Sequence, residues 1–167
     1  MLNPDSREEK KRERGCVVRA IQTAFNRPVS EEMWDYRLQQ TDQLRSTTGR
    51  WRDLPHHHPQ KAQLIREEYW QEISNFLTFL EYIKQSNSDL GEAIKAHQMI
   101  FMSGKASTIE HFLNQNGKIL LAMPHHIMHI GRLPGTRLIY SVSDQDHPIV
   151  DLHSKPRSWE LFVFKPL

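Results

Sequence analysis

Residues 14–26 read RGCVVRAIQTAFN and contain the only cysteine of the chain, Cys16, directly after a glycine. Apolar side chains recur after this cysteine at the three- and four-residue spacing of a helix that has one face in a protein core. These side chains are Val17, Val18, Ala20, Ile21, Ala24 and Phe25. The pattern predicts a helix that begins at Cys16 and packs its apolar face against the rest of the fold.

A cysteine in the first turn of a helix is well placed to be reactive. The amide N–H groups there have no partner within the helix, and the helix dipole adds partial positive charge, so the thiolate is favoured over the thiol. In such a setting the pKa can fall from ~8.5 into the range of about 3.5–7.5. Gly15 has no Cβ and is expected to let a substrate backbone approach closely. We interpret Cys16 as a candidate nucleophile, against the alternative of a small, inert core side chain.

The composition limits the class of protein. The chain has 167 residues and a formal net charge of +2, which suits one domain with its own core and gives no indication of nucleic-acid binding. A single cysteine excludes an internal disulfide. No window approaches the ~20 apolar residues that span a bilayer, and no signal-peptide pattern follows the charged start. We expect no membrane span, and a cytoplasmic location or export without a cleaved signal peptide.

The N-terminal segment is strongly charged, with EKKRER at residues 9–14. We interpret residues 1–13 as a charged arm, either solvated or helical, that precedes a single domain at residues 14–167.

Helical patterns dominate the first two thirds of the chain. Ser30, followed by two glutamates, is typical of an N-cap. Asp89 with Glu92, and Ser107 with Glu110, resemble two further helix starts. Helices are expected at residues 16–25, 31–44, 60–85, 89–100 and 107–116, with a loop at residues 45–60.

After Gly117 the pattern changes to short runs rich in β-forming residues. Strands are expected at residues 118–124, 125–132, 136–143, 148–152 and 160–166. Leu-Pro-Gly at residues 133–135 indicates a turn. Helices followed by an antiparallel sheet are typical of the α+β class.

A reactive cysteine needs an imidazole partner, and the predicted sheet supplies several. Strand alternation puts His126 on one face of its strand, with His125 and His129 on the other. Only one of these faces is expected to look toward the helix of Cys16, so the two sets are alternatives.

The histidine in turn needs an acid or amide that fixes its orientation. Asp144, Asp146 and Asp151 are the candidates. Asp144 and Asp146 follow the strand that the predicted hairpin lays beside the histidine strand.

Two segments of the chain resemble papain-like cysteine peptidases of the peptidase C39-like and phage-type groups. CVVRAI at residues 16–21 is similar to their sequence at the start of the central helix. STIEHFLNQNGKILLAMPHHIMHIG at residues 107–131 and LIYSVSD at residues 138–144 are similar to their later helix, their histidine strand and the hairpin after it.

The resemblance implies a papain-like fold in which N-terminal helices, with the nucleophile at a helix start, pack on a C-terminal antiparallel sheet. It implies Cys16 as nucleophile and His126 as general base and acid. The family pattern has an acid directly after the tyrosine, where this chain has Ser141, so Asp144 is the expected third residue. No upstream Gln or Asn is in place for an oxyanion hole, and the backbone N–H of Cys16 is the donor that we expect.

These observations lead to a hypothesis of a thiol-dependent hydrolase that acts on an amide of a protein or peptide substrate. The amide is a peptide bond, an isopeptide bond or a glutamine side chain, and a small effector that modifies another protein fits such chemistry. We predict no cofactor and no metal, since the adjacent histidines at residues 56–58 lack metal-site spacing.

Two other hypotheses stay open from the sequence. One is an inactive papain-like interaction domain that presents Tyr69, Trp70 and Phe79 to a partner. The other is a metal protein that uses the C-terminal histidines, with His125 and His129 on one strand face and a carboxylate from the next strand.

Overall fold

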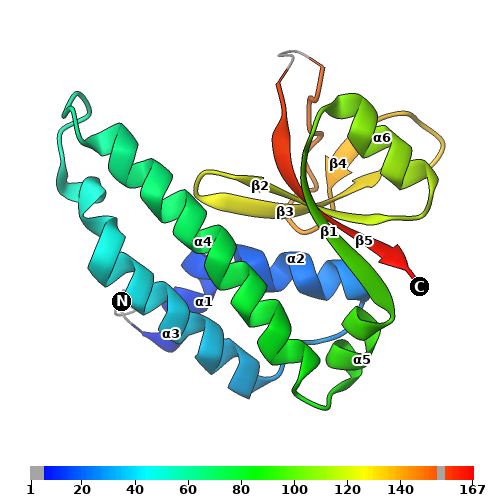
Figure 1. Ribbon diagram of the computed structural model, residues 1–167, viewed down its shortest axis with the longest axis horizontal. Helices are drawn as coiled ribbons and strands as arrows, with labels where there is room; N and C mark the ends of the chain where they lie inside the picture. The colour runs from blue at the N-terminus through cyan, green and yellow to red at the C-terminus, as the bar shows by residue number, and fades with distance from the viewer. Residues whose placement is uncertain (1–5, 154–156) are drawn as a thin grey trace.

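The computed structural model describes residues 6–153 and 157–167 (Figure 1). Over these residues the chain is α+β, with six α-helices, one 3-10 helix and a five-stranded antiparallel sheet. The elements are α1 (Arg7–Arg14), α2 (Cys16–Phe25), α3 (Glu31–Thr48), η1 (Gly49–Asp53), α4 (Lys61–Lys84), α5 (Asp89–Lys95), β1 (His97–Gly104), α6 (Ala106–Asn114), β2 (Lys118–Met123), β3 (His126–Arg132), β4 (Ile139–Ser141) and β5 (Trp159–Pro166). No helix among the described residues is long and apolar enough to cross a membrane.

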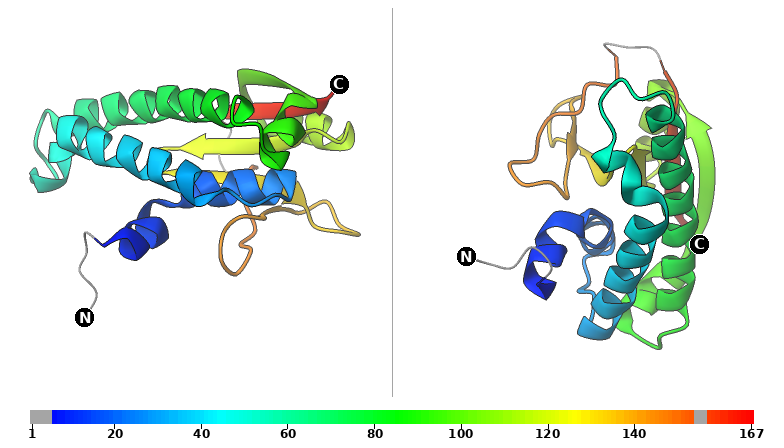
Figure 2. Two further views of the ribbon diagram at one scale, coloured as in Figure 1. Left: turned by 90° about the horizontal axis from the view of Figure 1, so that it is seen from below. Right: turned by 90° about the vertical axis from the view of Figure 1, so that its left-hand side faces the viewer.

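The sheet has the strand order β1-β5-β2-β3-β4, and every neighbouring pair is antiparallel. The C-terminal strand β5 therefore lies inside the sheet, between β1 and β2. Helix α6 covers one face, and α2, α4 and α5 pack on the other (Figures 1 and 2).

The two central strands divide their side chains between two apolar cores. Leu120 and Phe162 belong to the core beneath α2 and α4, whereas Leu121 and Leu161 belong to the core beneath α6. Strands covered on both faces are apolar at successive positions, which explains why KILLAM and ELFVF read as continuous apolar runs.

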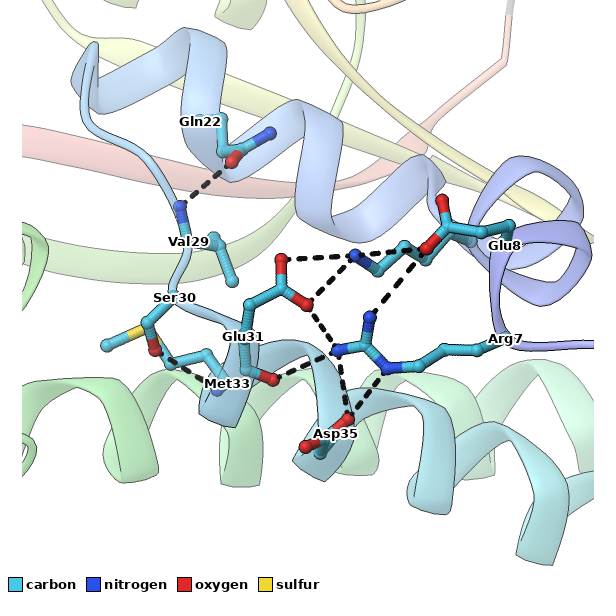
Figure 3. A network of polar contacts seen from close by, with 9 residues as sticks. Arg7, Glu8, Gln22, Val29, Ser30, Glu31, Met33 and Asp35 are labelled. Atoms are coloured by element: carbon cyan, nitrogen blue, oxygen red, sulfur yellow. Dashed lines mark hydrogen bonds and ion pairs between the residues drawn. The ribbon is translucent and has the colours of Figure 1, made fainter.

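The helix that begins at Cys16 is confirmed. All six of its predicted apolar residues are buried, and Asn26 ends it with a left-handed φ of 51°. The connection to α3 is fixed by two hydrogen bonds: Val29 N–H donates to Gln22 Oε1 at 2.8 Å, and the predicted cap Ser30 accepts from Met33 N–H at 3.2 Å (Figure 3).

Gly15 has a different role from the expected one. A Cβ there would lie 2.3 Å from the Lys11 carbonyl oxygen, 2.7 Å from the Arg19 guanidinium and 3.0 Å from the Trp34 ring. The space beside Gly15 is therefore filled by the protein itself. The absence of a side chain at Gly15 allows α1 and α2 to meet closely, and the junction leaves no room for a substrate backbone.

The charged arm is helical from Arg7 and lies against α3, while residues 1–5 are outside the described part of the chain. Arg7 pairs with Glu31 at 2.5 Å and with Asp35 at 3.0 Å (Figure 3). Arg14 pairs with Asp42 at 2.5 Å. Helix α1 buries no residue of its own, so these ion pairs hold it where the chain enters α2.

The helix predicted at residues 89–100 is wrong in its second half. Helix α5 ends at Lys95, and residues 97–104 form β1, which pairs with β5 along its whole length. Pairing with a distant strand overrides the local helical pattern. The cap is Ser88, whose side chain accepts from Gly91 N–H, rather than Asp89.

Other boundaries also differ from the prediction. Helix α6 begins at Ala106 after Lys105, so Ser107 is inside the helix and is not its cap. The loop predicted at residues 45–60 contains the last turn of α3 and η1. The strand predicted at residues 136–143 shrinks to β4, and residues 148–152 contribute one bridge, Tyr140 to Ile149.

Helix α4 is confirmed, and two of its buried residues bear on the site and on the alternative hypotheses. Glu68 is buried although it is charged, and it accepts two hydrogen bonds from Arg52 at 2.9 and 3.0 Å and one from Trp51 at 3.0 Å. Phe79 is fully buried, so it cannot join Trp70 in a surface for a partner.

Candidate active site

Cys16 lies at the first position of α2 and faces the start of β3. Its side chain is partly buried and hydrogen bonds with His126, and the backbone N–H of Ile127 donates to the sulfur. Burial by itself raises the pKa of this thiol. The hydrogen bonds from His126 and Ile127 and the positive charges of His126 and Arg37 outweigh that effect, so the pKa of Cys16 is lowered.

His126 connects the thiol to a carboxylate. Its Nε2 lies 2.8 Å from Oδ2 of Asp144, and this bond leaves the other ring nitrogen for Cys16. The hydrogen bond with Cys16 raises the pKa of His126, burial lowers it, and the bond with Asp144 raises it again, for a value of about 9. With the pKa of the thiol lowered and that of the imidazole raised, the pair favours a thiolate beside an imidazolium near neutral pH.

Asp144 is held in place by Ser141. The Ser141 hydroxyl donates to Oδ2 of Asp144 at 2.8 Å, and the backbone N–H of Asp144 donates back to the Ser141 oxygen at 3.3 Å. Burial raises the pKa of Asp144, but the bonds from His126 and Ser141 outweigh this and lower it. Ser141 itself has no solvent exposure. The carboxylate is thus ionised and fixed in orientation.

The pairing of β4 with β3 explains why Asp144 reaches His126. Ser141 lies opposite Ile130 in the ladder. The chain then continues along the same strand, because Val142 N–H donates to the His129 carbonyl at 2.8 Å and His129 N–H donates to Ser143 Oγ at 3.0 Å. Asp144 follows and lies beside the first residue of β3.

The expectation that only one face of the histidine strand looks toward the helix of Cys16 is wrong. Both side chains contact α2: His126 bonds with Cys16, and His129 Nδ1 lies 3.0 Å from Thr23 Oγ1. Seven residues of helix, about 10 Å at 1.5 Å per residue, separate these two contacts. Burial, with a smaller effect of Lys118, lowers the pKa of His129 to about 4, so this ring is neutral at pH 7. Position along α2, rather than the strand face, distinguishes the two histidines.

The remaining residues from the sequence analysis have other surroundings. His125 adopts a left-handed φ of 70° and its ring packs against that of Trp51, with centroids 4.8 Å apart. Asp151 accepts from the backbone N–H of His153, and Asp146 lies in the exposed loop after Asp144. Across residues 6–153 and 157–167, no group of three or more His, Cys, Asp or Glu side chains could hold a metal ion.

A pocket of about 210 Å³ opens beside Cys16. It lies between α3, α4 and the β2–β3 hairpin, and its apolar walls include Val17, Ile73, Phe76 and Phe162. This volume is below the ~300–1,000 Å³ of typical small-molecule sites, and it suits a single side chain rather than a cofactor.

Arg37 in this pocket is a residue whose importance the sequence analysis missed. Its side chain is 2% exposed, pairs with Glu72 and donates to Gln40 Oε1 at 3.1 Å. Its charge helps to lower the pKa of Cys16. The sequence held one signal of this role: Arg37 occupies a position in α3 where the helical spacing of Met33 and Leu38 predicts a buried residue. A buried arginine needs partners for its charge, so such a position indicates a polar site.

Comparisons of the chain with protein-family models, curated proteins and solved structures gave no match.

Proposed function

We propose that the protein is a papain-like thiol hydrolase that acts on an amide of a protein or peptide substrate. Cys16 is the nucleophile, His126 is the general acid and base, and Asp144 orients His126. The observation that carries the proposal is the His126 ring, which bridges the thiol and the carboxylate and whose pKa is raised by that contact.

Each proton and bond in the reaction has a place in this arrangement. The Cys16 thiolate attacks the amide carbonyl carbon, and the imidazolium of His126 donates its proton to the leaving nitrogen as the C–N bond breaks. The resulting thioester is attacked by water, from which His126 takes a proton, and the thiolate departs as the carboxylic acid forms. The same steps serve a peptide, an isopeptide or a glutamine side chain.

The start of α2 suits the charge that develops on the carbonyl oxygen. Cys16 is the first residue of this helix. Backbone N–H groups in the first helical turn stabilise an oxyanion. We assign the backbone N–H of Cys16 as one such donor. The similarity of residues 16–21 to the papain-like peptidases also supports the proposal.

An activated ester tests the chemistry without knowledge of the substrate. With p-nitrophenyl acetate, we expect an acetyl group on Cys16, detectable by mass spectrometry, followed by continuing release of nitrophenol. Cys16→Ala and His126→Ala should abolish turnover while leaving the circular dichroism spectrum unchanged, and Asp144→Ala should reduce it. His129→Ala is the control, because His129 contacts Thr23 rather than Cys16.

The outcome also separates the enzyme from an inactive interaction domain. Acetylation that never turns over, or that is unchanged in His126→Ala, would contradict the proposed hydrolase and favour the inactive domain.

A further inference from the structure

Four arginines line the pocket that contains Cys16: Arg14 at the end of α1, Arg37 and Arg45 on α3, and Arg52 in η1. Two of the pocket's three glutamates are already neutralised. Glu68 accepts two hydrogen bonds from Arg52, and Glu72 pairs with Arg37. The third, Glu13, is exposed to solvent.

Several N–H groups of these arginines have no acceptor. The side chain of Arg14 is 9% exposed and that of Arg37 is 2% exposed, yet the Nε of each is buried without a hydrogen-bond partner. A buried donor left unpaired costs about 1–3 kcal/mol. Arg14 and Arg37 therefore hold positive charge next to the candidate nucleophile, while their unpaired Nε atoms are closed off from solvent.

Arg45 adds positive charge without a partner. Among the described residues its guanidinium makes no hydrogen bond or ion pair, whereas Arg14 pairs with Asp42 and Arg52 pairs with Glu68. Burial and the charges of Arg14 and Arg52 lower the pKa of Arg45, as expected where like charges are close together.

We propose that this pocket binds the carboxylate of an acidic side chain on the substrate, next to the carbonyl that Cys16 attacks. The apolar walls formed by Val17, Ile73 and Phe76 accommodate the methylene stem. The guanidinium of Arg45, the pocket arginine that holds no ion pair among the described residues, binds the carboxylate beside Arg14 and Arg37. The inference rests on the proposed function and specifies its substrate class: a protein or peptide with a glutamate-like residue beside the reactive amide.

Two alkylating reagents of equal length test this assignment. The first is 5-(2-iodoacetamido)pentanoic acid, and the second is its terminal carboxamide. In both, the Cys16 sulfur forms a bond to the methylene carbon and iodide leaves with the electron pair. After correction for their rates with N-acetylcysteine, we expect the carboxylate reagent to alkylate Cys16 about tenfold faster at pH 7, as one charge-assisted hydrogen bond of about 1.4 kcal/mol predicts.

Substitution of a pocket arginine should remove the preference. Arg45→Gln is the first choice, because Arg45 lies on the exposed side of α3 and holds no ion pair among the described residues. Arg50→Gln is the matched control, since Arg50 is exposed in η1 and does not line the pocket. The preference should fall toward onefold in Arg45→Gln and stay near tenfold in Arg50→Gln.

The outcomes distinguish failure of this inference from failure of the proposed function. Equal alkylation by both reagents, with Cys16 still reactive below pH 7, would overturn the carboxylate pocket and leave the hydrolase proposal intact. If Arg45→Gln still reacts faster with the carboxylate reagent, the charge of His126 causes the preference. That result would also overturn the inference. A competition experiment measures how strongly 5-acetamidopentanoate slows alkylation of Cys16 by the carboxylate reagent. If inorganic phosphate slows this alkylation equally, the pocket is not specific for a carboxylate.

If neither reagent labels native protein, the proposed function fails and the pocket needs its own measurement. In Cys16→Ser protein, titration with 5-acetamidopentanoate should shift the arginine Nε–H NMR signals of Arg14 and Arg37. Saturable shifts in these signals would support the pocket independently of catalysis, and their absence would overturn it.

Discussion

At the scale of single residues, the imidazole of His126 is the group on which the account depends. It lies between a thiol whose pKa it lowers and a carboxylate 2.8 Å away. Cys16 was visible in the sequence because it is the only cysteine and begins an apolar helix. Asp144 was one of three acids, and its choice depended on the course of the hairpin.

Ser141 shows why part of the site could not be predicted. In the sequence it stands where the family pattern has an acid, and it read as a departure from that pattern. In the structure its buried hydroxyl donates to Asp144 and so positions the carboxylate that holds His126. A short-range hydrogen bond of this kind depends on loop conformation, which residue spacing does not specify.

We predict that Ser141→Ala weakens the candidate triad without abolishing it. Loss of one hydrogen bond to a carboxylate, worth about 1.5–3 kcal/mol at most, should raise the pKa of Asp144 and lower turnover of p-nitrophenyl acetate by about tenfold. Because Asp144 then protonates at higher pH, the acid limb of the pH–rate profile should shift to higher pH. The measurement is turnover between pH 3 and pH 8, flanking the ordinary Asp pKa of about 3.9.

Ser143→Ala is the matched control for this experiment. It also removes a buried hydroxyl, but one that accepts from the His129 backbone rather than contacting Asp144. A similar shift of the acid limb in both variants would show that Ser141 acts through general stability and has no specific effect on Asp144.

At the scale of elements, two close contacts fix the site. The chain after β4 follows β3 and delivers Asp144, and the junction of α1 and α2 places Cys16. The predicted helices at residues 16–25 and 60–85 were recovered because each has a regular apolar stripe. Strand β1 was missed because HQMIFMSG follows a helix directly and is stabilised by β5, some 60 residues later.

The α1–α2 junction gives a stability prediction. Gly15→Ala would place a Cβ 2.3 Å from the Lys11 backbone carbonyl, which cannot move without shifting α1. We expect a loss of about 1–3 kcal/mol in the free energy of unfolding, the usual cost of overpacking. Urea unfolding followed by tryptophan fluorescence measures it.

The control is Gly131→Ala, where the nearest atoms to a new Cβ are side-chain carbons, Val142 Cγ2 at 3.1 Å and Tyr140 Cε1 at 3.6 Å. Its effect should be clearly smaller. An equal loss in the two variants, or none in Gly15→Ala, would show that the junction tolerates a side chain and that α1 is loosely placed.

At the scale of the whole molecule, the sheet separates two cores. The candidate site lies at the start of α2, on the face of the sheet that α2, α4 and α5 cover. The α+β class followed from the change of sequence period after Gly117, and it is confirmed. The layering was not predictable from pattern alone, because β2 and β5 are apolar on both faces and α6 lies between β1 and β2 in the chain. The pocket beside Cys16 likewise exists only once α3, α4 and the hairpin have packed together.

The most direct test of the central claim is the rate of iodoacetamide alkylation of Cys16 as a function of pH, in native protein and in His126→Ala. Since the pKa of Cys16 is lowered and that of His126 is raised to about 9, alkylation should proceed well below pH 7 in the native protein. This low-pH reaction should disappear in His126→Ala, where burial without the imidazolium disfavours the thiolate. A single titration near the ordinary thiol pKa of ~8.5 in both proteins, or no labelling before denaturant is added, would contradict the thiolate–imidazolium pair and make Cys16 a structural residue.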